Sequence, residues 1–232
     1  MISALIDVAR RLYYNQFFSG ILHTSVYCLK RELKNCETVL DLGCGNNSSL
    51  QYCRVKYSVG VENFPPYLEE SRLKHIHSEY VQSDLNHINF PTKSFDAVLL
   101  LSVIEHLDKE SAGILLDKAE KIAKKKVIIT TPRGFLKQNV VDGNELQQHK
   151  SGWEIEEMGQ RGYRAWGMSG LKILRGAENP CSNSKDFLAS LTSTIRFRPK
   201  LFWALVAELS QAFVYYFPQF AFEVFYVKEI TA

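Results

Sequence analysis

Three acidic residues stand at the ends of successive apolar stretches in the first half of the sequence. Asp41 lies in "VLDLGCG", Glu62 ends "YSVGVE" and Asp84 ends "EYVQSD". Gly43 and Gly45, which follow Asp41, let the backbone turn sharply and allow a ligand to approach the chain closely. A helix that begins after such a turn offers free N–H groups, which suit a nucleotide-containing cofactor. The spacing therefore indicates a cofactor site at the ends of these stretches.

The details of this pattern narrow the choice of cofactor. The fingerprint of dinucleotide-binding proteins has a third glycine where this sequence has Ser48, and no lysine follows as it does in a P-loop. Asp41 would repel a pyrophosphate, but it suits the ammonium group of an amino acid. Glu62 can accept hydrogen bonds from both ribose hydroxyls, and Asp84 can accept one from the adenine amino group, with the Leu85 backbone beside it. We therefore expect S-adenosylmethionine, and a nicotinamide dehydrogenase is the less favoured enzyme class.

Five motifs in the same order resemble the class I S-adenosylmethionine-dependent methyltransferases, most closely the broad small-molecule group called methyltransferase type 11. They lie within residues 37–132 and read "VLDLGCG", "VGVE", "VQSDL", "FDAVLLLSVIEHL" and "VIITTP". "HKSGWEIEEMGQRGYRAWG", residues 149–167, is similar to the helix and strand that follow in the family. The resemblance implies methyl transfer by in-line displacement. The substrate that we expect is a small molecule, apolar or aromatic.

The resemblance also assigns roles to individual residues. In related enzymes a glutamate at the position of Ser102, three residues before a Glu-His pair, helps to bind a divalent metal; because serine stands here, we predict no metal. Ser102 would instead lie near the sulfonium of the cofactor. The cofactor-binding residues that the resemblance implies are Asp41, Gly43, Cys44, Gly45, Glu62, Asn63, Asp84, Leu85 and Ser102.

His106, in "VIEHL", is the candidate catalytic residue. A positioned base accelerates methyl transfer to a hydroxyl by about 10²–10⁴-fold, and an unperturbed histidine titrates near ~6.5. The alternative, which we favour, is that Glu105 and His106 cap a helix or orient the cofactor.

Candidate substrate residues come from two places in the sequence. His149 and Trp153 lie beyond the fifth motif, where the substrate is met in the family, although Trp153 also suits the packing of a helix. Tyr14, with Tyr13 and Phe17, lies on an N-terminal helix that either closes over the pocket or packs in the core. The Asn/Asp-Pro-Pro-Tyr/Phe motif of enzymes that methylate nucleic-acid bases is missing after the fourth motif. This argues against a nucleic-acid substrate.

Strands and helices alternate through the middle of the sequence and must position these residues. The alternation predicts an open parallel sheet with helices on both faces, which binds ligands at the carboxyl ends of its strands. Amphipathic helices are expected over 2–18 and 109–123, the latter capped by Asp108, with the lysine run 124–126 at its end. The terminal "AFEVFYVKEI" would be the antiparallel last strand of the seven-stranded, Rossmann-like sheet that the resemblance implies.

We expect one domain over residues 1–232. Apolar positions at helical spacing between the sixth and last strands predict a helical insertion, able to cover the ligand end of the sheet. Its aromatic side chains, among them Phe202 and Trp203, suit an apolar substrate, a partner surface or packing on the sheet. The expected parts are N-terminal helices (1–35), a cofactor-binding core (36–170), the helical insertion (171–218) and the final strand (219–232).

Composition sets further bounds. A net charge of +3 and a pI near 8.5 do not point to a nucleic-acid binder. Five cysteines without a C-x-x-C pair argue against a disulfide framework or structural zinc, and favour a reducing, cytoplasmic setting. We expect no signal peptide.

One apolar region, residues 201–227, resembles a membrane segment. Its longest uncharged run has 14 residues, whereas a spanning helix needs about 20. We therefore expect no transmembrane segment, but this region is compatible with peripheral membrane contact. Two alternatives to a small-molecule enzyme stay open: a non-catalytic subunit that binds S-adenosylmethionine, and a methyltransferase acting on a macromolecule or on a lipid at a membrane surface.

Overall fold

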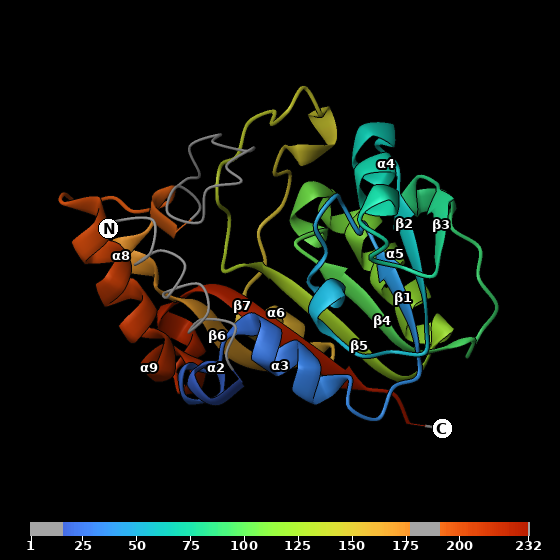
Figure 1. The fold of residues 1–232 in the computed structure, drawn as a ribbon, viewed down its shortest axis with the longest axis horizontal. Coiled ribbons are helices and arrows are strands. Elements are labelled where there is room, and N and C mark those ends of the chain that lie inside the picture. The colour runs from blue at the N-terminus through green and yellow to red at the C-terminus, as the bar shows by residue number, and fades with distance from the viewer. Residues whose placement is uncertain (1–15, 177–190, 232) are drawn as a thin grey trace.

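A single sheet organises the computed structural model, which describes residues 16–176 and 191–231. In the described part of the chain the sheet has seven strands in the order β3-β2-β1-β4-β5-β7-β6 (Figure 1). Neighbouring strands from β3 to β5 pair in parallel, and β7 runs antiparallel to both β5 and β6. The Rossmann-like, mostly parallel sheet with an antiparallel last strand is confirmed.

The elements alternate along the chain up to β6. The strands are β1 (Thr38–Leu42), β2 (Tyr57–Glu62), β3 (Glu79–Gln82), β4 (Phe95–Leu101), β5 (Ala123–Pro132), β6 (Arg164–Leu171) and β7 (Ala221–Glu229). The α-helices are α2 (Gln16–Leu22), α3 (Ser25–Glu32), α4 (Pro65–Leu73), α5 (Lys109–Ile122), α6 (Ile155–Gln160), α8 (Lys200–Leu209) and α9 (Gln211–Tyr216). Short 3₁₀ turns follow several strands, including η1 (Ser49–Tyr52) after β1 and η2 (Leu85–His87) after β3.

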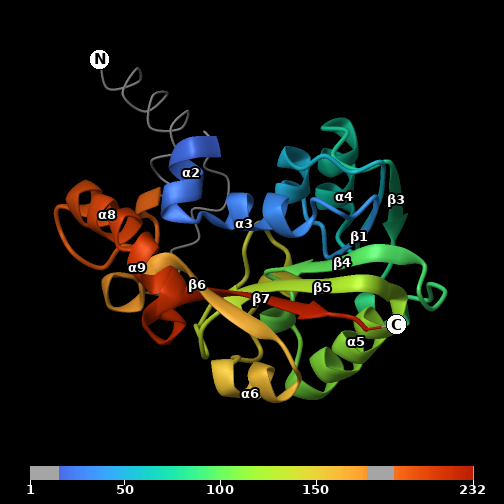
Figure 2. The same cartoon turned by 90° about the horizontal axis from the view of Figure 1, so that it is seen from below.

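The central strands are buried on both faces, which explains their continuous apolar sequences. Side chains alternate between two cores: Leu40 and Val98 pack with α5, whereas Val39 and Leu99 pack with α3. Helices α5 and α6 lie on one face of the sheet and α2 and α3 lie on the other (Figure 2). The sheet is therefore a rigid platform whose strand ends fix the positions of the side chains that follow them.

Helix α5 begins as the sequence predicts, but it ends earlier. The Asp108 side chain accepts the N–H of Ser111, and the helix ends at Ile122. The lysine run 124–126 was expected at the end of this helix, and that prediction is wrong because these residues form the start of β5. Acidic partners explain the difference: Lys126 Nζ lies 2.8 Å from Glu32 and 3.3 Å from Glu229.

The helices between β6 and β7 pack directly on β6. Glycines allow this contact, because a Cβ atom on Gly167 would lie 2.1 Å from the Val214 carbonyl oxygen, and one on Gly170 would lie 2.2 Å from that of Ala207. The expected insertion thus contains α8 and α9, which are separated at Ser210. In the described ranges no helix has both the length and the apolar character needed to cross a bilayer.

The N-terminal helix predicted over 2–18 falls almost entirely outside the described residues, as does the first part of the insertion. Of that predicted helix, only the start of α2 is described. The candidate substrate residue Tyr14 therefore also lies outside the described residues.

Candidate cofactor and active site

The turn after β1 has the backbone form that its glycines predict. Gly43 and Gly45 both have positive φ, +70° and +57°. A side chain on Gly43 would also collide with Val103, since its Cβ atom would lie 2.7 Å from Val103 Cγ2. The N–H groups of Gly43 and Cys44 both donate to the Val61 carbonyl oxygen. The turn is thereby held across the ends of β1 and β2.

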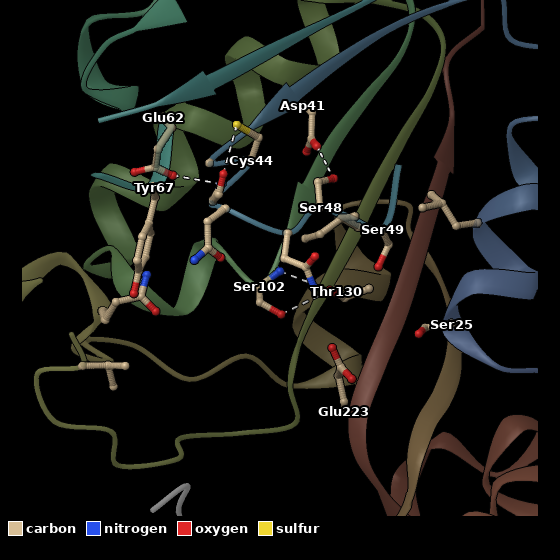
Figure 3. Close-up of a pocket in the computed structure, with 18 of the residues that line it drawn as sticks. Ser25, Asp41, Cys44, Ser48, Ser49, Glu62, Tyr67, Ser102, Thr130 and Glu223 are labelled. Carbon is tan, nitrogen blue, oxygen red and sulfur yellow. Dashed lines mark hydrogen bonds between the residues drawn. The ribbon is translucent and has the colours of Figure 1, made fainter. Parts of the chain in front are cut away.

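Asp41 is the most deeply placed of the predicted acids, with 1% of its surface exposed. Its Oδ2 atom accepts a hydrogen bond from Ser48 Oγ at 2.5 Å and lies 3.0 Å from His77 Nε2. Its Oδ1 atom is buried and has no hydrogen-bond partner among the described residues. One carboxylate oxygen is therefore fixed by the protein, while the other has no partner among the described residues; Asp41 itself lines the larger cavity described below (Figure 3).

Ser48 and His77 are site residues that the sequence reasoning did not assign. Ser48 occupies the position of the missing third glycine, and its hydroxyl both donates to Asp41 and accepts the N–H of Leu50. The His77 side chain passes over Gly60 to reach Asp41. A Cβ atom on Gly60 would lie 2.8 Å from the Nδ1 atom of His77. A glycine inside "YSVGVE" was the one sequence signal of this close approach.

Glu62 is held in place by backbone donors. Its Oε2 atom accepts the N–H of Gly45 at 3.0 Å, and its Oε1 atom accepts the N–H of Phe64 at 2.8 Å. Burial is the largest influence on this carboxyl and raises its pKa, although the backbone N–H groups oppose the shift. Each oxygen retains further acceptor capacity for a ligand hydroxyl.

Two adjoining cavities lie at the carboxyl ends of the parallel strands. The larger has a volume of about 430 Å³ and the smaller about 160 Å³. Both are lined by Gly43, Glu62 and Ser102. The predicted cofactor residues that line only the larger cavity are Asp41, Cys44 and Gly45; those that line only the smaller one are Asn63, Asp84 and Leu85. The structure therefore brings every predicted cofactor residue to one continuous site.

The far wall of the larger cavity contains a carboxylate that the sequence reasoning missed. Glu223, on β7, accepts a hydrogen bond from Ser169 Oγ at 2.8 Å. Burial is the main cause that raises the pKa of Glu223, while hydrogen bonds from Ser169 and Thr130 oppose it. Thr130 also lines the cavity and accepts the N–H of Ser102 (Figure 3). The sequence feature that could have indicated Glu223 is that it is the single acidic residue in the otherwise apolar stretch "AFEVFYV".

His106 lies at the smaller cavity, beside Asp84 and Leu85. Burial, followed by the neighbouring His149, lowers the pKa of His106 to about 4. Its Nδ1 atom lies 3.3 Å from the Gln148 carbonyl oxygen. His106 is therefore a neutral, oriented ring at pH 7 and a weak proton acceptor.

The two residues predicted to meet the substrate beyond β5 do not line either cavity. His149 stacks edge-on against His106 with 4.8 Å between ring centroids, and its Nδ1 atom lies 2.6 Å from the Leu136 carbonyl oxygen. Trp153 is 2% exposed, and its indole N–H donates to Ile104 O and Ser151 Oγ. The expectation that Trp153 meets the substrate is corrected, because its ring is packed in the main core.

One group of side chains in the described ranges has donors suited to a metal ion. Ligand atoms of Glu105, His106 and His149 all lie within 4.8 Å of one another. Ser102, where related enzymes supply a further carboxylate, has only a hydroxyl. The absence of a metal stays a prediction, and calorimetric titration with Mg²⁺ and Zn²⁺ would test it.

Comparisons with known proteins agree with this geometry. Residues 40–130 match a family model described as a methyltransferase domain. No curated protein sequence matches the chain. Among solved structures, the chain is similar to a SAM-dependent methyltransferase from Archaeoglobus fulgidus, with a TM-score of 0.52 and 17% identity over 92% of this chain and 98% of that one.

Two further structures share the fold. The first is a chain of the complex between the Haloferax volcanii Trm112 methyltransferase activator and the putative methyltransferase; the TM-score is 0.53, with 15% identity over 92% of each chain. The second is the methyltransferase domain of bacterial CtHen1-C, with a TM-score of 0.51 and 22% identity over 68% of this chain and 94% of that one. At these identities the structural likenesses establish the fold.

The family match and the fold concern the same part of the molecule. Residues 40–130 run from β1 into β5 and carry all the predicted cofactor residues. The sheet is mostly parallel with an antiparallel last strand, as the resemblance implied; in the structure that strand, β7, lies between β5 and β6. The match of residues 40–130 to a methyltransferase domain and the shared fold are thus consistent with a class I, S-adenosylmethionine-dependent methyltransferase.

Proposed function

We propose that this chain transfers the methyl group of S-adenosylmethionine to a small, apolar or aromatic molecule bound in the larger cavity. The observation that carries the proposal is the Asp41 carboxylate: Asp41 lines this cavity, and its buried Oδ1 atom has no partner among the described residues. Leaving such an acceptor unsatisfied costs about 1–3 kcal/mol. The ammonium group of the cofactor would satisfy it.

The order of the acids along the two cavities supports this assignment. Asp41 lines only the larger cavity, Glu62 lines both, and Asp84 lines only the smaller one. A ligand with an amino-acid end, a central ribose and a terminal adenine would meet these carboxylates in that order. In this proposal Asp41 holds the ammonium group, Glu62 holds the ribose hydroxyls, and Asp84 with Leu85 holds the adenine.

The wall formed by Ser102, Thr130 and Glu223 would serve the transfer itself. When bound, the cofactor supplies a methyl group on a positively charged sulfur, so the protein has mainly to align the acceptor. Ser102 lies at the junction of the cavities, where the sulfonium is expected. For a hydroxyl acceptor, Glu223 would accept the proton as the acceptor oxygen bonds to the methyl group, because its raised pKa makes the carboxylate a better base.

The position of His106 supports the orienting role over the catalytic one. It lines the cavity that we assign to adenine, and its low pKa makes it a poor base at pH 7. Glu223 is the better candidate, since it lies across the larger cavity from the residues that would hold the methionine end (Figure 3).

The size and lining of the larger cavity support a small substrate. About 430 Å³ must accommodate both the methionine end of the cofactor and the acceptor. Leu29, Leu101, Val141 and Phe225 give part of its wall an apolar character. A lipid acceptor at a membrane surface is the second candidate, favoured by the exposed apolar side chains of α8 and α9. A cytoplasmic location stays a prediction.

Calorimetric titration of the purified chain with S-adenosylmethionine, with NAD as the control ligand, tests the proposal. We expect micromolar binding of S-adenosylmethionine alone. Acceptors would then be screened for incorporation of a labelled methyl group, apolar phenols first. Binding without transfer to any acceptor would favour a non-catalytic subunit, and failure to bind the cofactor would refute the assignment of the cavities.

A further inference from the structure

Helices α8 and α9 present a continuous apolar stripe to solvent. Leu201, Leu205, Leu209, Phe213 and Phe217 follow one another at intervals of four residues, and each is 44–72% exposed. The spacing continues across both helices because the residue between them, Ser210, keeps helical angles (φ −69°, ψ −9°). Residues four apart are neighbours on a helix, and each such step turns about 40° further around the axis, so these side chains form a band that winds along the exposed side of α8 and α9. We call these five residues the apolar stripe.

The opposite face of the same helices already makes the contacts that hold them to the domain. Ala204, Ala207 and Val214 are fully buried against β6 and its surroundings. Glu208, the acidic residue of α8, forms an ion pair of 2.9 Å with Arg175. The apolar stripe is therefore not needed to attach α8 and α9 to the sheet. These helices lie at the edge of the molecule (Figure 1), and an exposed apolar patch at such a place marks an interaction surface.

Positive charges precede the apolar stripe in the chain. Arg196, Arg198 and Lys200 are exposed and immediately precede its first residue in the chain. Arg196 also lines a separate cavity of about 410 Å³, together with Arg133 and Lys172.

This cationic cavity adjoins the stripe through aromatic side chains. Phe220, half-exposed, lines the cavity and stacks on Phe213 of the stripe, with 6.0 Å between ring centroids. Ile173, 70% exposed, lines the same cavity. A pocket with cationic side chains and apolar rims suits a headgroup that carries a phosphate, while the neighbouring stripe suits acyl chains.

We propose that the apolar stripe and its cationic surroundings dock this protein on the surface of an anionic membrane. A helix with exposed Leu and Phe beside Lys and Arg lies in the membrane interface, with its apolar face among the acyl chains. Charge complementarity selects this occupant. A second copy of the chain would bring the same positive charges to the contact and no anion, whereas anionic headgroups neutralise them. This inference is independent of which cofactor the active site binds.

Co-sedimentation of the full chain with vesicles tests the apolar part of the proposal. Vesicles of phosphatidylcholine alone are compared with vesicles containing equal amounts of phosphatidylcholine and phosphatidylglycerol. We expect binding to the anionic vesicles. In the Leu205→Glu/Leu209→Glu variant the partition coefficient should fall at least tenfold, since two leucine side chains would no longer be buried among the acyl chains.

Matched substitutions elsewhere on the surface control for general effects of lost apolar area. Ile114 on α5 is 52% exposed and Leu73 on α4 is 72% exposed, close to the 53% and 72% of Leu205 and Leu209. The Leu73→Glu/Ile114→Glu variant should bind vesicles like the original chain. Equal losses in both double variants would overturn the proposal.

The charged part is tested by Arg198→Ala/Lys200→Ala, with Lys121→Ala/Lys124→Ala as its control. Each cation near an anionic surface is worth about fivefold in affinity, so the first pair should weaken binding to phosphatidylglycerol vesicles by about thirtyfold. The control pair should have little effect.

One pair of results would show a protein interface instead of a membrane surface. The original chain would not bind anionic vesicles, and sedimentation velocity would show a dimer that Leu205→Glu/Leu209→Glu abolishes. Calorimetry of the Leu205→Glu/Leu209→Glu variant with S-adenosylmethionine distinguishes a loss of vesicle binding from a loss of the cofactor site.

Discussion

At the scale of single residues, the carboxylates of the proposed site differ in the hydrogen-bond partners that the protein gives to their oxygen atoms. Asp41 has one oxygen fixed by Ser48 and His77 and one without a partner among the described residues. Both oxygens of Glu62 accept backbone N–H groups, so its position is set by the turns after β1 and β2. In the proposed site, the first arrangement would leave an acceptor for a cation, and the second would orient a carboxylate toward neutral hydroxyls.

Substitution of either carboxylate should weaken cofactor binding. We expect Asp41→Ala and Glu62→Ala each to raise the Kd for S-adenosylmethionine tenfold or more, because hydrogen bonds to charged groups contribute about 1.5–3 kcal/mol. Calorimetry measures the change, and circular dichroism confirms that each variant is folded. Ser48→Ala is the matched control for Asp41, since it removes the neighbour and leaves the carboxylate. Unchanged Kd values in both acid variants would contradict the assignment.

Substitutions of Glu223 and of His106 should have opposite effects on kcat and on the Kd for the cofactor. With a hydroxyl acceptor, Glu223→Gln should lower kcat by about 10²–10⁴-fold and leave the Kd for the cofactor unchanged. His106→Ala should raise that Kd and have the smaller effect on kcat. A reversal of these two outcomes would restore His106 as the base.

The pH dependence of stability reports on Glu223 without any substrate. Because its pKa is higher in the folded than in the unfolded protein, its contribution to stability is fully present below the unfolded pKa and is lost as pH rises through the folded pKa. From acid to neutral pH, the Tm of the original chain should therefore fall relative to that of Glu223→Gln. Parallel Tm curves for the two proteins would show that the pKa is not raised.

At the scale of elements, glycines decide how closely helices approach strands. Gly167 on β6 lies under the Val214 carbonyl of α9, where a side chain has no room. Gly113 on α5 has open space around it, although it also interrupts an element interior. The same substitution should therefore have opposite effects at the two positions.

Thermal unfolding of two alanine variants tests this difference. Gly167→Ala should destabilise the fold by about 1–3 kcal/mol, because the added methyl group forces α9 away from β6. Gly113→Ala should stabilise it by about 0.5–1 kcal/mol, because alanine restricts the unfolded chain and favours the helix. If Gly167→Ala were as stable as Gly113→Ala, the tight packing of α9 on β6 would be wrong.

At the scale of the whole molecule, the proposed cofactor site joins the ends of four strands and the turns that follow them. Asp41, Glu62, Asp84 and Ser102 come from β1 to β4 and line one continuous pair of cavities. A ligand held by all of them binds only the folded chain and so stabilises the entire sheet.

Bound cofactor should accordingly raise the melting temperature. At a concentration about 100 times Kd the stabilisation is about 2.7 kcal/mol, which corresponds to roughly 5–10 °C for a domain of this size. Differential scanning fluorimetry with S-adenosylmethionine measures the shift, and NAD is the control ligand. The shift should be smaller in Asp41→Ala at the same concentration. A shift of equal size with NAD would point to a less selective site.

The sequence by itself determined the order of the elements and the acids at or just after the carboxyl ends of β1, β2 and β3. These features depend on local patterns: apolar runs, glycine turns and helical periodicity are visible within a few residues. Once the strands are parallel and adjacent, their carboxyl ends must share one edge, so Asp41, Glu62 and Asp84 were predicted together. The N-cap and the apolar face of α5 followed from the same local rules.

Only the tertiary structure decided which distant residues complete the site. Glu223 reaches the cavity because β7 enters between β5 and β6, with Glu223 paired to Pro132 at the carboxyl end of β5. His77 reaches Asp41 across Gly60, and Trp153 is taken into the core instead of the pocket. Each of these placements results from contacts between segments far apart in the chain, which no local spacing encodes. The exposed stripe on α8 and α9 has the same origin, since the packing of one apolar face on β6 left the other in solvent.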